Sequence, residues 1–214
     1  GAGFPRHKRW LYDSGLRVPW MVRVPEAYRD WLPQAPGSAT DELVSFVDLA
    51  PTALHLAGIP VPDYMQGRAF MGPDLSPPRD YIYAGRDRMD ERYDMQRAVR
   101  DKQFKYVRHY EPFKPFCQYM NTSEKGEIMQ AIRAAAADGT LPEAGRHIVQ
   151  PQKPEEELFD LEKDPYELNN LAADPAYAQV LQRLRAAHAA WSDETMDTGD
   201  RKSTRLNSSH EWIS

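Results

Sequence analysis

The sequence has little cysteine, no long apolar run and no excess of basic charge. Its 214 residues include one cysteine, Cys117, which excludes a disulfide framework within the chain. No apolar run approaches the roughly 20 residues that a membrane-spanning helix needs, so we expect no membrane partner. The formal net charge of -5 argues against a nucleic-acid partner, because surfaces that bind nucleic acid are usually basic. The composition is that of an ordinary globular protein.

The sequence also lacks an initiator methionine and an apolar signal segment at its start. We therefore expect the chain to begin inside a longer gene, and its compartment does not follow from a targeting signal. Residues 199–214 break the character of the chain and show no hydrophobic period. We expect this segment to be a non-native, disordered tail.

The first part of the chain has the pattern of an α/β domain. Alternating apolar residues predict a strand over residues 20–24, ended by Pro25, and a second short strand over residues 43–47. Asp48 is expected to cap a helix that ends at Gly58. Strand, loop, strand and helix in this order are typical of α/β folds. We therefore predict that residues 1–62 belong to a large α/β domain.

A proline-rich stretch without a period follows and suggests a domain boundary near residue 62. Beyond it, short strands are predicted over residues 81–84, 97–99, 104–109 and 158–161, with a tight turn at residues 101–102. A surface helix is expected over residues 128–139. A final helix should begin at Asp174, with Pro175 in its first position. We predict a small α+β subdomain over residues 63–198, with a four-stranded antiparallel sheet and a C-terminal helix.

Three ordered blocks carry the functional signal. Residues 8–19 have the spacing Lys-x-x-x-Tyr-(Asp/Glu)-x-Gly-x-Arg-x-Pro and precede an apolar run that ends in Arg-x-Pro. Residues 45–58 contain Ser-x-x-Asp-x-x-Pro-Thr and then Leu-Ala-Gly, and residues 157–171 end in Asp-Pro and Glu-x-x-Asn-Leu. Together they resemble the C-terminal portion of the type I, or formylglycine, sulfatases of the alkaline phosphatase superfamily.

Residues 83–99 are most similar to the heparan N-sulfatase, or sulfamidase, branch of that family. They show its order Phe/Tyr-x-Gly, Glu and Met-x-Arg-(Ala/Ser)-Val. Asp90 stands where that branch is expected to have histidine. An O-sulfate and an N-sulfate therefore both stay open as the scissile group.

The resemblance implies a sulfatase that removes sulfate from a sulfated sugar or glycosaminoglycan by transfer to a formylglycine aldehyde hydrate. It implies that Lys8 binds the sulfate and that Ca²⁺ is the cofactor of the complete enzyme, which would be periplasmic or extracellular. Neither Cys117 nor Ser76 lies in the sequence Cys/Ser-x-Pro-x-Arg, and the paired aspartates that hold calcium are missing. We expect this chain alone to be inactive, and its oligomeric state stays open.

A mixed-charge run over residues 86–92 is the other candidate site. It follows a predicted strand, and charges of both signs suit a polyhydroxylated or amino-sugar substrate through charge-assisted hydrogen bonds. A solvated loop is an equally weighted alternative. The predicted substrate-binding residues are Arg86, Arg88, Asp90 and Glu91.

Other polar residues receive structural interpretations. We interpret His7 and Arg9 as solvated loop charges, Cys117 as a small buried hydrophobic residue and His188 as a packing residue. No pair of histidines has metal-ligand spacing, so no metal site is predicted in this chain.

Two alternatives to a sulfatase stay open. One is a phosphodiesterase or phosphonate hydrolase of the same superfamily. The other is a non-catalytic carbohydrate-binding module on a sulfatase scaffold. The residues upstream would distinguish the three, because each differs in nucleophile and metal set.

Overall fold

The computed structural model describes residues 9–32, 34–89, 91–197 and 199. It divides into two compact units: unit 1 holds the described parts of residues 1–18 and 83–214, and unit 2 holds residues 19–82. These units do not follow the predicted division at residue 62, because the segment before residue 19 packs on the later sheet. The predicted boundary at residue 62 refers to a large α/β domain of which residues 1–62 would be only a part, so it stays a prediction. Among the described residues, no helix is long and apolar enough to cross a membrane.

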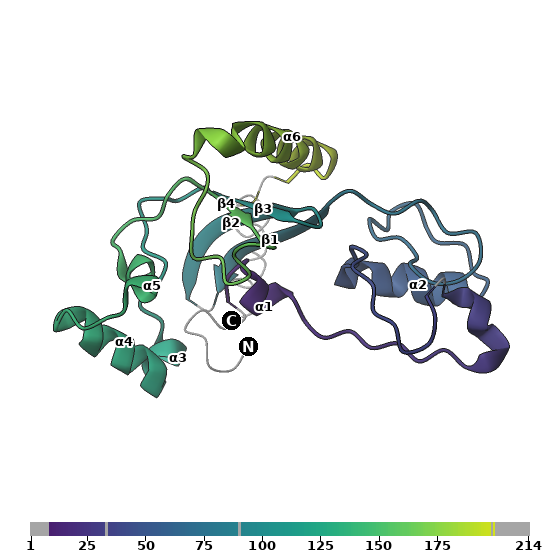
Figure 1. The fold of residues 1–214 in the computed structure, drawn as a ribbon, viewed down its shortest axis with the longest axis horizontal. Helices are drawn as coiled ribbons and strands as arrows, with labels where there is room; N and C mark the ends of the chain where they lie inside the picture. Colours follow the sequence, from purple (N-terminus) through teal and green to yellow (C-terminus); the bar gives the residue numbers. More distant parts are fainter. Residues whose placement is uncertain (1–8, 33, 90, 198, 200–214) are drawn as a thin grey trace, which may run out of the picture. The chain divides into compact units, whose positions relative to one another are not determined.

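Unit 1 is built on a four-stranded sheet in the order β1-β2-β3-β4 (Figure 1). The strands are β1 (Ile82–Met89), β2 (Arg92–Arg100), β3 (Phe104–His109) and β4 (Glu156–Asp160). The β2–β3 and β3–β4 pairs are antiparallel. In the β2–β3 turn, the carboxylate of Asp101 accepts hydrogen bonds from the N–H groups of Gln103 and Phe104. The predicted strands and turn are confirmed, although β1 and β2 are longer than predicted.

The helices of unit 1 lie at its start, between β3 and β4, and at its end. They are α1 (Asp13–Leu16), α3 (Asn121–Glu124), α4 (Glu127–Ala137), α5 (Glu143–Arg146), η3 (His147–Val149), η4 (Pro175–Tyr177) and α6 (Ala178–Glu194). The predicted surface helix is α4, which ends before Gly139 at φ 78°. Asp174 caps as predicted, since its carboxylate accepts the N–H of Ala176 at 2.9 Å. The chain then continues through η4 into α6.

The sheet buries a different surface on each face. Helix α6 covers one face, where Trp191 stacks on Tyr83 of β1 with ring centroids 5.0 Å apart (Figure 1). The opposite face, here called the inner face, is covered by residues 9–16 and by the segment between β3 and β4. Leu11 packs there against Ala98 and Val107. A second cluster on this face contains Trp10, Tyr12, Phe116, Cys117, Met129, Ile148 and Phe159.

Unit 2 contains little regular structure. Its elements are η1 (Glu26–Trp31), η2 (Phe46–Asp48) and α2 (Leu49–Leu56), and α2 stops before Gly58 at φ 70° as predicted. The predicted strands over residues 20–24 and 43–47 are wrong, because the structure assigns no strand to either segment and Met21 is 93% exposed. An extended segment becomes a strand only when a neighbour pairs its N–H and C=O groups. No described residue of unit 2 supplies one.

A buried carboxylate organises the centre of unit 2. Asp48 is fully buried, and it accepts hydrogen bonds from the N–H of Ser45 at 2.8 Å and the N–H of Arg68 at 3.0 Å. The guanidinium of Arg79 adds an ion pair at 2.6 Å. Asp48 immediately precedes α2, but its side chain makes no capping bond to that helix. The predicted cap is therefore corrected: the carboxylate joins three segments of unit 2 instead.

Candidate functional site

The structure describes three of the five predicted site residues. Arg86 and Arg88 belong to β1, and Glu91 lies in the turn that follows. Lys8 and Asp90 lie outside the described residues, and their predicted roles stay predictions.

The described residues of the mixed-charge run do not form the predicted loop. Residues 86–89 form the end of β1, Glu91 lies in a turn, and Arg92 begins β2. Residues two apart in a strand share a face, and this places Arg86 and Arg88 on the inner face. Arg88 is exposed, whereas the side chain of Arg86 is only 5% exposed. Glu91 accepts the N–H of Asn121 at 2.7 Å, which joins this turn to the segment after β3.

Arg86 is a buried cation with few partners. Its guanidinium lies over the indole ring of Trp10, 5.7 Å from the ring centroid. The Nη1 atom is 3.9 Å from the carboxylate of Asp94, and neither Nε nor Nη1 has a hydrogen-bond partner among the described residues. Burial lowers the pKa of Arg86, Asp94 opposes that effect, and the charge of Arg9 adds to it. The site thus holds positive charge that its neighbours neutralise only in part.

Asp94 is shared with a second buried cation. Lys153 reaches one carboxylate oxygen at 2.9 Å, and Gln96 donates to the other at 2.7 Å. Burial lowers the pKa of Lys153, and the charge of Asp94 opposes that effect. One carboxylate therefore faces two cations, Arg86 and Lys153.

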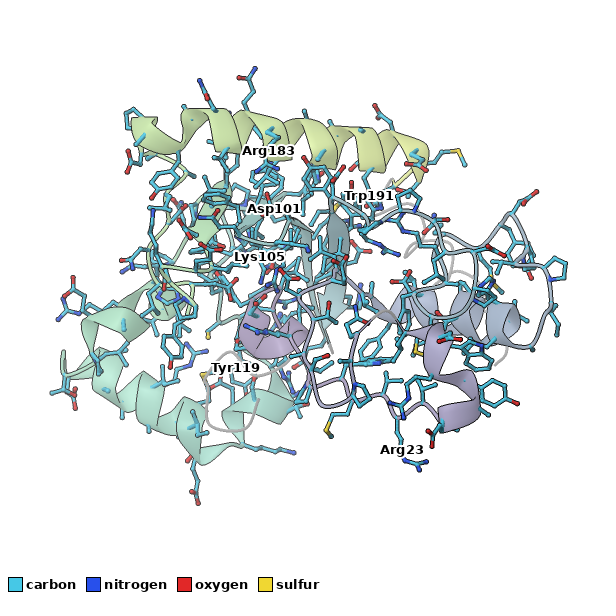
Figure 2. The ribbon with its side chains drawn as sticks, turned by 45° about the vertical axis from the view of Figure 1, so that its right-hand side comes forward. Arg23, Asp101, Lys105, Tyr119, Arg183 and Trp191 are labelled. Carbon is cyan, nitrogen blue, oxygen red and sulfur yellow. The ribbon has the colours of Figure 1, made fainter. Side chains whose placement is uncertain are left out.

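A second buried charge network fixes the segment that follows Arg9. Lys105 of β3 bonds to Asp13 at 2.5 Å and to Glu167 at 2.7 Å, and Figure 2 shows Lys105 in the interior of unit 1. Arg100 bonds to the other oxygen of Asp13 at 2.8 Å. The N–H of Asp13 donates to Glu167 at 2.6 Å. Burial raises the pKa of Glu167, and Lys105 opposes that effect.

Tyr12 is held by a further buried carboxylate. Its hydroxyl donates to Oε2 of Glu157 in β4 at 2.9 Å. That carboxylate oxygen is also 2.8 Å from Nε2 of His109. Tyr12 and Asp13 are thus anchored to three strands of the sheet. Because the backbone is continuous, these anchors also fix the position of Trp10 and Arg9.

A pocket of about 630 Å³ opens beside Arg9 and Trp10. Its other walls come from the segment after β3 and from the start of α4. The guanidinium of Arg9 lies 3.7 Å from the sulfur of Met120, and Arg9 is half-buried. Our interpretation of Arg9 as a solvated loop charge is therefore wrong. The remaining lining residues are Cys117, Gln118, Thr122, Ser123, Lys125, Gly126, Glu127, Ile128 and Met129.

The described residues do not include a metal centre or an activated nucleophile. They contain no group of three or more His, Cys, Asp or Glu side chains that could hold a metal ion. Cys117 is buried as predicted, and burial raises the pKa of its thiol to about 11, so it stays protonated at neutral pH. His188 packs against Tyr106 with ring centroids 5.9 Å apart, which confirms its structural role. Neither a metal-ligand set nor a reactive thiol is therefore identified within the described part of the chain.

The four-stranded sheet with α6 on one face matches the C-terminal subdomain of sulfatases. Residues 4–139 match the family described as "N-sulphoglucosamine sulphohydrolase, C-terminal", and the chain belongs to that family. It is 41% identical over 89% of its length to an ulvan-active sulfatase of Formosa agariphila, of which it covers 31%. It is 29% identical over 92% of its length to human N-sulphoglucosamine sulphohydrolase, of which it covers 40%.

A solved structure of a 2-O GAG sulfatase has the same fold. It is 25% identical, with a TM-score of 0.52, and the match covers 78% of this chain and 28% of that chain. The chain thus spans about a third of the length of the relatives it matches. The predicted resemblance to the C-terminal portion of sulfatases is confirmed.

Sequence reasoning missed Trp10, Asp94 and Lys153. These residues come together only because residues 9–16, β2 and the segment before β4 meet on the inner face. Asp94 carries a local signal, since a charged residue in the middle of a strand is costly to bury without a partner. The sequence does not say which cation is the partner, because Lys153 follows 59 residues later.

Proposed function

We propose that this chain is the C-terminal part of an enzyme that hydrolyses a sulfate ester or sulfamate on a sulfated polysaccharide. Membership of the family, with 41% identity to an ulvan-active sulfatase, carries this proposal. The exposed cation of Arg88 in β1 supports it, because every such substrate is a polyanion. Ulvan-like and glycosaminoglycan-like substrates both fit, since relatives named for each are similar to this chain.

In this proposal, different residues of the chain bind the sulfate group and the sugar that carries it. We assign the reacting sulfate to Lys8, whose ammonium would offset the charge that develops on the sulfate oxygens. We assign the carrier sugar to Arg88, Asp90 and Glu91, with Arg86 as a buried charge in the same strand as Arg88. Among the described residues of this set, Arg88 and Glu91 are exposed, whereas Arg86 is buried.

In this proposal, the nucleophile and the metal-binding residues belong to other parts of the complete protein. Ca²⁺ in sulfatases would stabilise charge on the sulfate oxygens, but the described residues offer no group that fits a metal ion. We therefore derive no step through calcium. We expect this chain alone to release no sulfate, because the formylglycine motif and the paired aspartates are absent from its sequence.

The test of the assignment to sulfate is Lys8→Ala in the complete enzyme. Loss of one charge-stabilising group should lower kcat/KM by roughly two to three powers of ten. Lys8→Arg should recover part of the loss, because it restores the charge with a different reach. Wild-type turnover by Lys8→Ala, at an unchanged melting temperature, would reject the role of Lys8.

The test of carrier recognition is Arg88→Ala, compared on two substrates. Removal of a charge-assisted contact should lower kcat/KM on a sulfated sugar roughly ten-fold. A small aryl sulfate lacks the sugar hydroxyl and carboxylate groups, so its hydrolysis should change much less. Equal losses on both substrates would show that Arg88 supports the fold or the common chemistry.

A further inference from the structure

The pocket beside Arg9 and Trp10 has the size and lining of a ligand site. Its volume of about 630 Å³ lies within the roughly 300–1,000 Å³ typical of small-molecule sites. That is far more room than an ordered water or a simple ion needs. It is formed by three separate segments of unit 1: residues 9–10, residues 117–123 and the start of α4.

The walls of the pocket combine apolar surface with hydrogen-bonding groups. Trp10 provides an aromatic surface, and Met120, Ile128 and Met129 provide aliphatic surface. The lining also contains polar side chains that suit the hydroxyl groups of a sugar. The polar lining consists of Gln118, Thr122 and Ser123.

The charge of the pocket favours an anionic ligand. Arg9 and Lys125 line it, against the single carboxylate of Glu127. Behind Trp10 lies the guanidinium of Arg86, which is nine-tenths buried and has two nitrogen atoms without hydrogen-bond partners among the described residues. Helix α4 begins at Glu127 with no side-chain cap at Gly126. Its first N–H groups add positive potential at the pocket.

An unpartnered donor also lies in the wall of the pocket. Trp10 is 3% exposed, and its indole Nε1 has no hydrogen-bond partner within the described part of the chain. A buried donor without an acceptor costs roughly 1–3 kcal/mol. An oxygen-rich ligand, reached by a small shift of the ring, would remove that cost.

The pocket is linked to both predicted recognition elements, to one through the sequence and to the other through hydrogen bonds. Arg9 directly follows Lys8 in the sequence. On the other side, the β1–β2 hairpin is joined to the pocket segment, because Arg92 donates to the carbonyl of Tyr119 and Glu91 accepts from Asn121. Figure 2 shows Tyr119 near α3 and α4. A ligand in the pocket would therefore lie beside the sugar that carries the scissile sulfate.

We propose that this pocket is a second carbohydrate subsite, which binds a sulfated or carboxylated sugar unit adjacent to the one that is desulfated. The subsite rests on the proposed sulfatase function. It makes the enzyme selective for oligosaccharides over single sugars, because only a longer chain reaches both positions. Its residues bind the substrate and take no part in bond cleavage.

The experiment compares pocket variants of the complete enzyme on two substrates, sulfated ulvan oligosaccharides and a small aryl sulfate. Lys125→Glu reverses an exposed charge in the pocket, and Ile128→Trp fills the pocket from a position that is 41% exposed. Each should lower kcat/KM on the oligosaccharide by roughly ten-fold, mainly through a higher KM, because Lys125→Glu removes a charge-assisted contact and Ile128→Trp occupies the space of the sugar unit. Hydrolysis of the aryl sulfate should stay within about two-fold of wild type.

Lys163→Glu is the matched control. Lys163 is an exposed lysine in the turn after β4, with a side chain that is 69% exposed, and it does not line the pocket. It should leave both activities unchanged. Unchanged oligosaccharide kinetics in both pocket variants, or equal losses on both substrates, would overturn the subsite. Absence of sulfate release from every substrate by the wild-type enzyme would instead overturn the proposed function.

A binding measurement separates these two failures. The quenching of tryptophan fluorescence by ulvan oligosaccharides should be saturable in the wild-type enzyme and weakened about ten-fold by Lys125→Glu. Saturable binding with that weakening, but without sulfate release, would support the subsite and reject the hydrolytic function. Equal binding by the wild type and Lys125→Glu would reject the subsite.

Discussion

Units 1 and 2 differ in how they obtain a core. Unit 1 closes its sheet on both faces, and central residues such as Val99, Leu158 and Leu184 are fully buried. Unit 2 buries the carboxylate of Asp48 at its centre and leaves large apolar residues exposed. The exposed residues of unit 2 include Trp20, Met21, Val22, Tyr28, Phe46, Val47, Leu49, Ile59 and Tyr64. Unit 1 is therefore stabilised by a hydrophobic core of its own. Unit 2 lacks the apolar burial that independent stability requires.

The largest expected effect is a contrast in hydrogen exchange between the two units. Amides of β2 and β3 open only when the sheet unfolds, whereas those of residues 19–82 have few buried contacts to hold them. In this chain by itself, we expect unit 2 to exchange at least about a hundred-fold faster than these strands. Hydrogen exchange followed by mass spectrometry measures it. Similar protection in the two units would show that unit 2 is stable without further residues.

A large loss of stability is expected when the buried network of unit 1 is broken. Lys105→Met leaves Asp13 and Glu167 buried without their shared cation, which should lower the free energy of unfolding by roughly 3–5 kcal/mol. The control is Arg185→Ala, which removes a pair to Glu156 from a side chain that is 51% exposed. That change should cost no more than about 1 kcal/mol. Urea unfolding followed by circular dichroism compares the two, and equal losses would contradict a special role for the network.

The smallest expected effect is a pH dependence that arises in unit 1 alone. Burial lowers the pKa of His188 from its ordinary value of 6.5, and the charges of Arg108 and Arg97 lower it further. Below pH 6.5 the unfolded chain therefore binds a proton that the folded chain does not. Stability should fall as the pH decreases from 6.5 towards the folded pKa, by at most about 1.4 kcal/mol per pH unit.

His188→Gln is the variant that checks this pH dependence. It should show a flatter dependence of the melting temperature on pH in that range than the wild type. An unchanged slope would assign the pH dependence to other groups.

The sequence predicted the fold of unit 1 well because its signals are local. The turn at Asp101 and the caps at Asp174 and Gly139 each depend on a few neighbouring residues, and each was confirmed. The strands over residues 20–24 and 43–47 were wrong because pairing is not local. An alternating pattern shows that a segment suits a sheet, and only a neighbouring strand makes it one.

The candidate site was predicted only in part for a similar reason. Residue types and spacing pointed to Lys8 and to residues 86–92, but not to the burial of Arg86 beneath Trp10. We expected Arg9 to be solvated because a cation beside an apolar segment usually is. Its side chain is half-buried instead, because residues more than 100 positions later form the pocket around it. Burial and pairing of charges depend on tertiary contacts that one stretch of sequence does not specify.

The bond from Asp13 to Glu167 also sets an order in time, because it joins residues 154 positions apart. At roughly 5–20 residues per second, Glu167 is synthesised about 8–30 s after Asp13. During that interval the carboxylate of Asp13 and the residues before it have no finished surface to dock on. Arg9 and Trp10 therefore reach their places in the pocket wall only after β4, the last strand of the sheet, has been made.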